Sequence, residues 1–322
     1  MSNKVKITRR GFFKVTGTSI GALFLRSSPA EGAGRSAPVR DSRLRYDVDR
    51  FREVAPEFIT HKEAGSIEPG LDRMRSISVS EKGDIVTVSG ETMYIFYAPD
   101  FKDAKSFPLP RVSSAVSWAD REKILVAFDG YADIYNTGGE KLGRVLAHET
   151  GSLITSVSVK NGLISAADAG RKRLLISDFK GRRLAAVEKG FQIPGKCFAT
   201  VIGPEGTVWV TNPGKHSLEE YSLKGEKLSR WGKFSMDIDG FAGCCNPVDF
   251  AIDRKGNFIT SEKGIPRIKQ HNRRGELTGV IAPPAKFRRN DQELFIDADA
   301  SGKIYVISNP EKRIRVFEPS AE

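Results

Sequence analysis

A short pattern recurs along this chain: a glycine in a polar turn, followed by residues that alternate between apolar and polar. Clear copies occupy residues 83–88, 206–211, 256–261 and 302–307, and weaker copies begin near residues 123 and 162. Successive copies are 39 to 50 residues apart. Alternation with a period of two is typical of β-strands. Repetition at this spacing therefore indicates one strand-rich unit that occurs six times.

A second turn follows the later strands of most units. Its glycines are Gly139, Gly181, Gly225 and Gly275. Glycine is favoured in such turns because it adopts positive φ without steric cost. Each unit therefore reads as four short antiparallel strands. A small sheet of this kind has two apolar faces, and packing six of them radially buries both. We predict an all-β fold, a six-bladed β-propeller with four-stranded antiparallel blades, over residues 46–322.

The two ends of this region complement each other. The last unit ends near residue 319 and lacks its fourth strand. An unassigned strand candidate lies at the other end, at residues 56–62. We expect this N-terminal strand to close the ring as the outer strand of the last blade.

The third strand of several units begins with arginine and an apolar residue, at residues 173–176, 267–271 and 313–317. With the glycine pattern, these strands resemble those of NHL-repeat propellers. The resemblance covers about residues 70–320 and is strongest in the last three units. It implies an architecture rather than one activity, because such propellers include lyases, lactonases, adaptor modules and ligand binders.

The N-terminus carries a different signal. Arg9 and Arg10 are followed by two aromatic residues, a lysine and an apolar run at residues 15–25. This resembles a twin-arginine (Tat) export signal. The run is shorter than the roughly 20 residues that span a bilayer, so we expect no stable membrane span. We expect residues 1–30 to be a signal peptide, recognised by the Tat translocase through Arg9 and Arg10, and residues 31–45 to be a disordered tether. The mature protein would be periplasmic or extracellular.

The charge of the chain argues against nucleic acid as a partner. The net charge is +11, but residues 1–30 contain six basic residues and no acidic ones, which leaves +5 for the remainder. Nucleic-acid binding would need a concentrated basic stripe. The chain has three cysteines, so at most one internal disulfide can form.

The topology of a propeller brings two sets of loops to one face: those between second and third strands, and those between successive blades. In this chain, these loops contain all three cysteines and a long insertion at residues 232–247. Loops of this length in a compact domain are usually functional or disordered. The candidate residues for ligand or partner binding are Cys244, Cys245, Asn246, Lys263, Arg267, Lys215, His216 and Arg173.

The adjacent cysteines Cys244 and Cys245 have three interpretations. In the first, the two cysteines form a strained disulfide with each other. In the second, they bind a soft metal such as copper or zinc together with Cys197. In the third, all three cysteines are unreactive thiols. The sequence leaves these alternatives open.

Motifs for covalent haem, serine hydrolases, zinc proteases and nucleotide-binding P-loops are absent from the sequence. The sequence therefore favours an exported binding or scaffold module that contacts an envelope protein or a small anionic ligand through the cysteine-bearing loops. The alternative is an exported redox or lyase-type enzyme with a metal or vicinal-disulfide site on the same face. The sequence assigns no cofactor and does not decide whether the protein is an enzyme.

Overall fold

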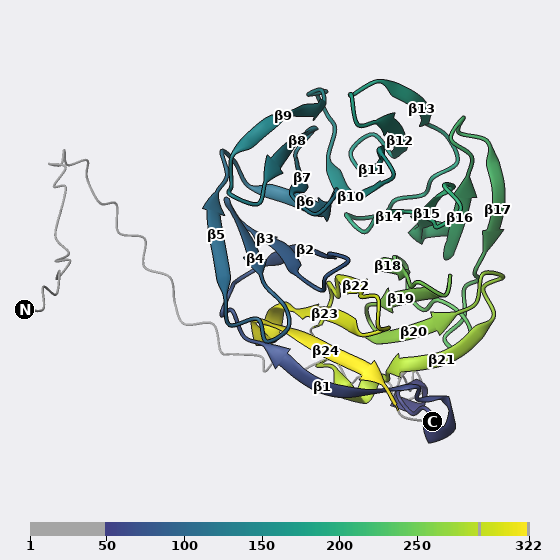
Figure 1. Cartoon of the computed structure of the whole chain (residues 1–322). Coiled ribbons are helices and arrows are strands. Elements are labelled where there is room, and N and C mark those ends of the chain that lie inside the picture. Colours follow the sequence, from purple (N-terminus) through teal and green to yellow (C-terminus); the bar gives the residue numbers. More distant parts are fainter. Residues whose placement is uncertain (1–48, 289–290, 321–322) are drawn as a thin grey trace, which may run out of the picture. The chain divides into compact units, whose positions relative to one another are not determined.

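The repeated units form a ring of six small sheets, each with four antiparallel strands (Figure 1). The computed structural model describes residues 49–288 and 291–320. We number the sheets as blades 1 to 6 in chain order. In blades 1 to 5 the strands follow one another outward from the axis in sequence order. The prediction of an all-β six-bladed propeller is confirmed.

The strands have the following bounds. Blade 1 contains β2 (Met74–Val79), β3 (Ile85–Ser89), β4 (Thr92–Phe96) and β5 (Ala104–Pro108), and blade 2 contains β6 (Ser113–Trp118), β7 (Lys123–Phe128), β8 (Tyr131–Asn136) and β9 (Lys141–Leu146). Blade 3 contains β10 (Ile154–Lys160), β11 (Leu163–Asp168), β12 (Arg173–Asp178) and β13 (Arg183–Val187), and blade 4 contains β14 (Thr200–Ile202), β15 (Val208–Asn212), β16 (Ser217–Tyr221) and β17 (Lys227–Trp231). Blade 5 contains β18 (Asp249–Ile252), β19 (Phe258–Glu262), β20 (Arg267–His271) and β21 (Leu277–Ala282), and blade 6 contains β22 (Ile296–Ala298), β23 (Ile304–Ser308), β24 (Arg313–Pro319) and β1 (His61–Ile67).

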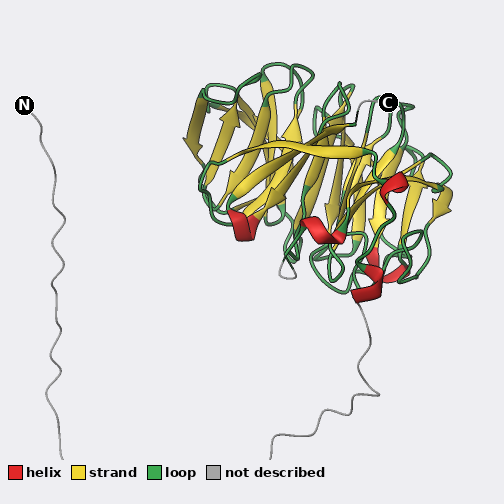
Figure 2. Ribbon diagram, turned by 90° about the horizontal axis from the view of Figure 1, so that it is seen from below, coloured by secondary structure: helices red, strands yellow, loops and turns green. Residues whose placement is uncertain are grey.

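Within the described residues, helix is limited to short 3-10 turns, most of which lie toward one side of the ring (Figure 2). These turns are η2 (Asp49–Phe51), η3 (Pro56–Phe58), η4 (Pro213–Lys215), η5 (Pro284–Lys286) and η6 (Asn309–Glu311). No helix in the described part of the chain has the length and apolar character needed to cross a membrane. The predicted signal peptide and tether, with Arg9 and Arg10, lie outside the described residues.

A strand from the start of the chain closes the ring. β1 pairs antiparallel with β24, and Arg315 of β24 donates two hydrogen bonds, of 2.8 and 2.7 Å, to the carboxylate of Glu63 in β1. The closure was predicted, but at residues 56–62. The strand begins later because Pro56 opens the 3-10 turn η3, and proline has no N–H to donate to a strand ladder.

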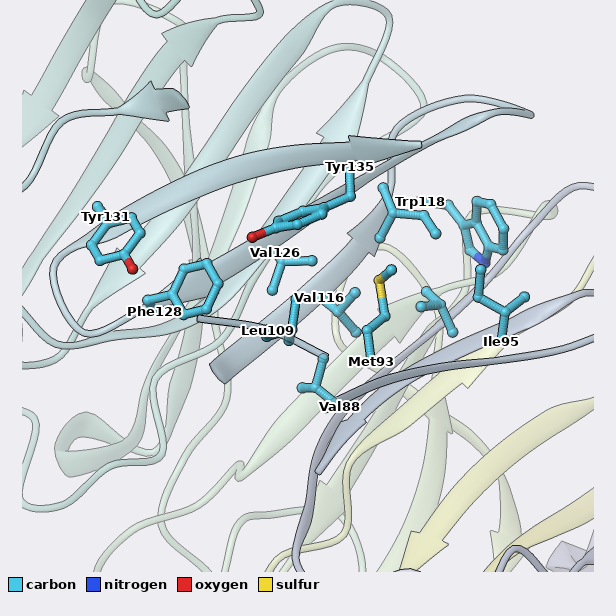
Figure 3. Close-up of a cluster of buried hydrophobic side chains, with 12 residues drawn as sticks. Val88, Met93, Ile95, Leu109, Val116, Trp118, Val126, Phe128, Tyr131 and Tyr135 are labelled. Atoms are coloured by element: carbon cyan, nitrogen blue, oxygen red, sulfur yellow. The ribbon is translucent and has the colours of Figure 1, made fainter. Parts of the chain in front are cut away.

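Apolar side chains fill the boundary between each pair of neighbouring blades, in six buried clusters. Figure 3 shows the cluster between blades 1 and 2, where Val88, Met93 and Ile95 of blade 1 face Val126 and Phe128 of blade 2. All five side chains are fully buried. Burial of each such side chain contributes roughly 1.5–3 kcal/mol. Because every blade takes part in two clusters, no blade is stable apart from its neighbours.

The inner strands line the axis and bond to one another through side chains. A serine or aspartate of one inner strand accepts a hydrogen bond from a backbone N–H of the next. The pairs are Ser76 with Val116 (3.2 Å), Ser117 with Val159 (3.3 Å), Ser156 with Thr200 (3.1 Å), Asp249 with Ile296 (3.0 Å) and Asp297 with Val79 (2.7 Å). These bonds satisfy backbone groups that have no further strand to pair with, and they place polar side chains around the axis.

Candidate functional site

Three loops bring the cysteines to one side of the ring, which we call the cysteine face. They are residues 188–199 between β13 and β14, residues 232–248 between β17 and β18, and residues 263–266 between β19 and β20. The sequence predicted that these loops share a face, because in a propeller the loops between second and third strands and those between blades emerge on the same side.

A buried charge network fixes the long loop at residues 232–248. Arg267 and Lys269 of β20 lie at 2.7 and 2.8 Å from the Glu262 carboxylate. Both also donate hydrogen bonds to the Gly240 carbonyl, at 3.0 and 2.6 Å. The second oxygen of Glu262 accepts the Ala242 backbone N–H at 2.8 Å. All three charged side chains are fully buried, so the loop is held by partners that have no alternative contact with water.

The pKa values in this network follow from the same contacts. Burial opposes ionisation of Glu262, but Lys269 and Arg267 outweigh it and hold the pKa of Glu262 below its ordinary value. Burial lowers the pKa of Lys269 to about 8, despite the attraction of Glu262. The structure thus gives Arg267 a supporting position beneath the loop. The sequence predicted Arg267 as a ligand- or partner-binding residue, but its guanidinium is enclosed by Glu262 and the long loop.

Asn246 also has a supporting position. Its side-chain amide donates hydrogen bonds to the carbonyls of Ala242 and Lys263, the latter at 2.9 Å. Its Oδ1 accepts the Lys263 backbone N–H at 2.9 Å. This buried asparagine joins the long loop to the turn at residues 263–266, and it thereby sets the positions of the two cysteines that precede it.

The side chain of Lys263 contacts Cys197, and its charge also acts on Cys244 and Cys245. Cys244 is exposed and Cys245 is buried, and their sulfur atoms lie 3.3 Å apart. The Lys263 ammonium donates to the Cys197 sulfur at 3.7 Å. All three cysteines are free thiols. Within residues 49–288 and 291–320, no three His, Cys, Asp or Glu side chains are arranged to hold a metal ion, and a lysine ammonium beside the sulfurs repels a cation.

Burial and charge act in opposite directions in this cluster. Burial raises the pKa of the Cys197 thiol, and Lys263 offsets only part of that effect. Burial and the hydrogen bond with Cys244 raise the pKa of Cys245. Burial alone would lower the pKa of Lys263, but its attraction to the neighbouring sulfurs raises it. Lys263 therefore stays charged and stabilises whichever thiol ionises.

A pocket of about 70 Å³ opens at the axis beside this cluster. All six blades or the loops leading into them contribute to it, and one lining residue from each is Arg75, Ser114, Thr155, Cys197, Asp249 and Glu293. This volume admits a few waters or one small charged group. The shared Cys197 joins the pocket to the thiol cluster.

The pocket contains polar groups without protein partners. The Arg75 guanidinium forms no hydrogen bond or ion pair with any described residue, and the Ser114 hydroxyl is buried without a partner there. Burial, with a smaller contribution from Asp297, raises the pKa of Asp249 to about 7. A buried polar atom without a partner is unusual in a folded protein, and an unpaired arginine is suited to a carboxylate or phosphate. The sequence analysis missed Arg75, Ser114 and Asp249, although the repeat register places them at the start of inner strands.

The remaining candidates lie elsewhere on this face. His216 stands beside the exposed Phe234, with ring centres 5.1 Å apart, and burial lowers its pKa. Its neighbour Lys215 is partly exposed, and its carbonyl accepts a hydrogen bond from Arg230 at 3.0 Å. Arg173 of blade 3 is buried and pairs with Asp168 at 2.9 Å. Its guanidinium is already neutralised there, so it does not contribute a free cation to the face.

Comparisons with known proteins support the fold but identify no family and no function. No protein-family model matches the sequence, and no curated protein matches it. One similar solved structure is a chain of a mitotic checkpoint complex, with TM-score 0.61 and 11% identity over 94% of this chain and 99% of that chain. Another is a structural genomics protein of unknown function from Bacteroides thetaiotaomicron, with TM-score 0.60 and 13% identity over 81% of this chain and 72% of that chain. At these identities the likeness shows a shared fold alone.

Proposed function

We propose that this protein is an exported binding module, and that its axial pocket on the cysteine face holds an anionic group of a small ligand or of an envelope protein. The observation that carries the proposal is Arg75, which has no side-chain partner among the described residues and lies in a pocket to which the whole ring contributes. A pocket assembled from all six blades is rigid, because each lining residue stands on or beside a packed inner strand.

The charge balance of the pocket supports an anionic ligand near neutral pH. Arg75, Lys196 and the adjacent Lys263 are cationic, whereas Glu293 is the main opposing charge. Asp249 carries less than a full negative charge at and below neutrality, because its pKa is raised to about 7. Binding should therefore strengthen as the pH falls from 8 to 6.

The proposal of export rests on Arg9, Arg10 and the residues around them. The ring closure is compatible with it, because the last blade needs a strand from each end of the chain. Such a propeller closes only once β24 has been synthesised, and export as a folded unit is compatible with that.

Titration calorimetry of the full-length protein tests the binding site. The probes are inorganic phosphate, succinate and a glutamate-rich peptide, at low salt and pH 6.5. We expect at least one probe to bind, and Arg75→Gln to weaken it about tenfold or more through loss of a charge-assisted hydrogen bond. The matched control is Arg254→Gln, which alters an exposed arginine in the turn between β18 and β19.

Equal affinity in Arg75→Gln and the unaltered protein would contradict the proposal, as would failure of all three probes to bind. Deleting the long loop is a poor test, because it would leave Arg267 and Lys269 buried without their carbonyl partners. The alternatives of a lyase-type enzyme and of a metal-dependent redox enzyme gain no support from the pocket, and we propose neither.

A further inference from the structure

The adjacent cysteines are held close together and made unequal by the fold. Their sulfur atoms are 3.3 Å apart, with Cys244 open to solvent and Cys245 buried. The loop that carries them is fixed on one side by Arg267 and Lys269 and on the other by Asn246. An exposed thiol with a second thiol directly behind it is the arrangement needed for attack on a disulfide followed by resolution.

Cys244 is the thiol suited to react, because it is exposed, whereas burial raises the pKa of Cys197 and of Cys245. Lys263 donates to Cys197 at 3.7 Å, and its charge acts on all three cysteines. A lysine near a cysteine stabilises the thiolate, which is the nucleophilic form. A disulfide between adjacent residues is strained, and strained disulfides are readily reduced. The closed form is therefore a stronger oxidant than a structural cross-link, so the dithiol reduces a substrate disulfide only when that disulfide is in excess.

We propose that Cys244 and Cys245 form a thiol–disulfide exchange site whose substrate is an exposed disulfide, with Lys263 as a positioning residue. The Cys244 thiolate attacks one sulfur of the substrate disulfide, so that a mixed disulfide forms and the other sulfur leaves as a thiolate. The Cys245 thiolate then attacks the Cys244 sulfur and releases the second half of the substrate. Two electrons pass from the cysteine pair to the substrate, and the two thiol protons end on the two released thiols.

This inference goes beyond the proposed anion binding and is tested separately from it. The reduced full-length protein is incubated with oxidised glutathione, its remaining thiols are alkylated after denaturation, and its peptides are identified by mass spectrometry. We expect loss of alkylation at Cys244 and Cys245 together, retention at Cys197, and release of two reduced glutathione molecules per protein. No variant is needed for this measurement, so folding of a mutant does not limit it.

Two cysteine variants separate the roles of the thiols. Cys245→Ser removes the resolving thiol, so a lasting glutathione adduct should accumulate on Cys244. Cys197→Ser is the matched control and should react as the unaltered protein does. Oxidation at Cys197 in place of Cys244, or no oxidation at any pH, would overturn the proposal.

The role of Lys263 is read from the pH profile of the exchange rate. Lys263→Gln should shift the rising limb of the profile upward by about one unit, which is roughly a tenfold loss of rate below the thiol pKa. Lys263→Arg should restore most of the rate, because it retains the positive charge. If the pH profile of the exchange rate is the same in Lys263→Gln as in the unaltered protein, Lys263 has no role in the exchange.

Discussion

Asp249 occupies an inner-strand position where Ser76 and Ser156 form the equivalent hydrogen bond in other blades. Serine accepts the same backbone N–H without a charge, so the ring itself does not require an ionised group there. Burial raises the pKa of Asp249 to about 7 and that of Asp297 to about 6. A neutral carboxyl at Asp249 is therefore compatible with both the fold and an anionic ligand.

The raised pKa of Asp249 predicts a pH-dependent contribution to stability. The folded state binds this proton up to about pH 7, whereas the unfolded chain releases it near the ordinary value of 3.8. The contribution is therefore complete below about pH 4 and is lost as the pH rises to 7. In Asp249→Asn, stability relative to the unaltered protein should rise by on the order of 2–4 kcal/mol across that interval.

Urea unfolding at successive pH values between 4 and 8 measures this difference. The control is Asp103→Asn, an exposed aspartate whose replacement should leave the profile unchanged. Profiles of Asp249→Asn and the unaltered protein that run parallel would show that Asp249 ionises normally.

At the scale of the elements, the turns between third and fourth strands do more than reverse the chain. Gly139 and Gly275 both have positive φ, and a Cβ atom on either would overlap an aromatic ring of the preceding blade. The rings belong to Phe107 of β5 and Trp231 of β17, which are the outer strands of blades 1 and 4. The turn glycine thus serves the packing between blades as well as the backbone conformation.

Two glycines with nearly equal φ separate these effects. Gly275→Ala must accommodate both a φ of +81° and the Trp231 ring, whereas Gly256→Ala meets open space at a φ of +80°. We expect Gly256→Ala to cost about 1–2 kcal/mol of stability, and Gly275→Ala to cost a further 1–3 kcal/mol from overpacking. Urea unfolding of both variants checks this, and equal losses would mean that the Trp231 ring moves aside freely.

At the scale of the whole molecule, stability depends on closing the ring. Arg315 and Glu63 bond to each other although 252 residues separate them. The cluster between blades 6 and 1 unites Ile307 and Ile314 with Met74 and Ile85. Loss of β1 would expose the edge of β24, and an exposed edge strand promotes association between molecules.

Two truncations test the closure. A chain of residues 49–322 keeps every described strand and should remain monomeric with a single unfolding transition. A chain of residues 70–322 lacks β1 and should unfold at clearly lower urea concentration and associate. Size-exclusion chromatography with urea unfolding distinguishes them, and equal behaviour of the two chains would show that the ring does not need β1.

The local sequence pattern was sufficient to predict the fold. The alternation of apolar and polar residues and the turn glycines act over a few residues, and both repeat along the chain. The position of β1 was less accurate, since the local effect of Pro56 competes with pairing to a strand at the far end of the chain. The candidate site was predicted in part. Loop order brought Cys197, Cys244 and Lys263 to one face, but it gave no means to separate buried arginines from free ones.

The amino-acid order by itself determined six repeated sheets, their turns and the face on which the cysteines lie. Only the tertiary structure decided that Arg267 is enclosed with Glu262, that Arg75 finds no side-chain partner in the described part of the chain, and that Asp249 shares a pocket with Cys197. The reason is physical: periodicity records how each residue faces its own strand, whereas burial and charge pairing depend on groups that the ring brings together from distant blades.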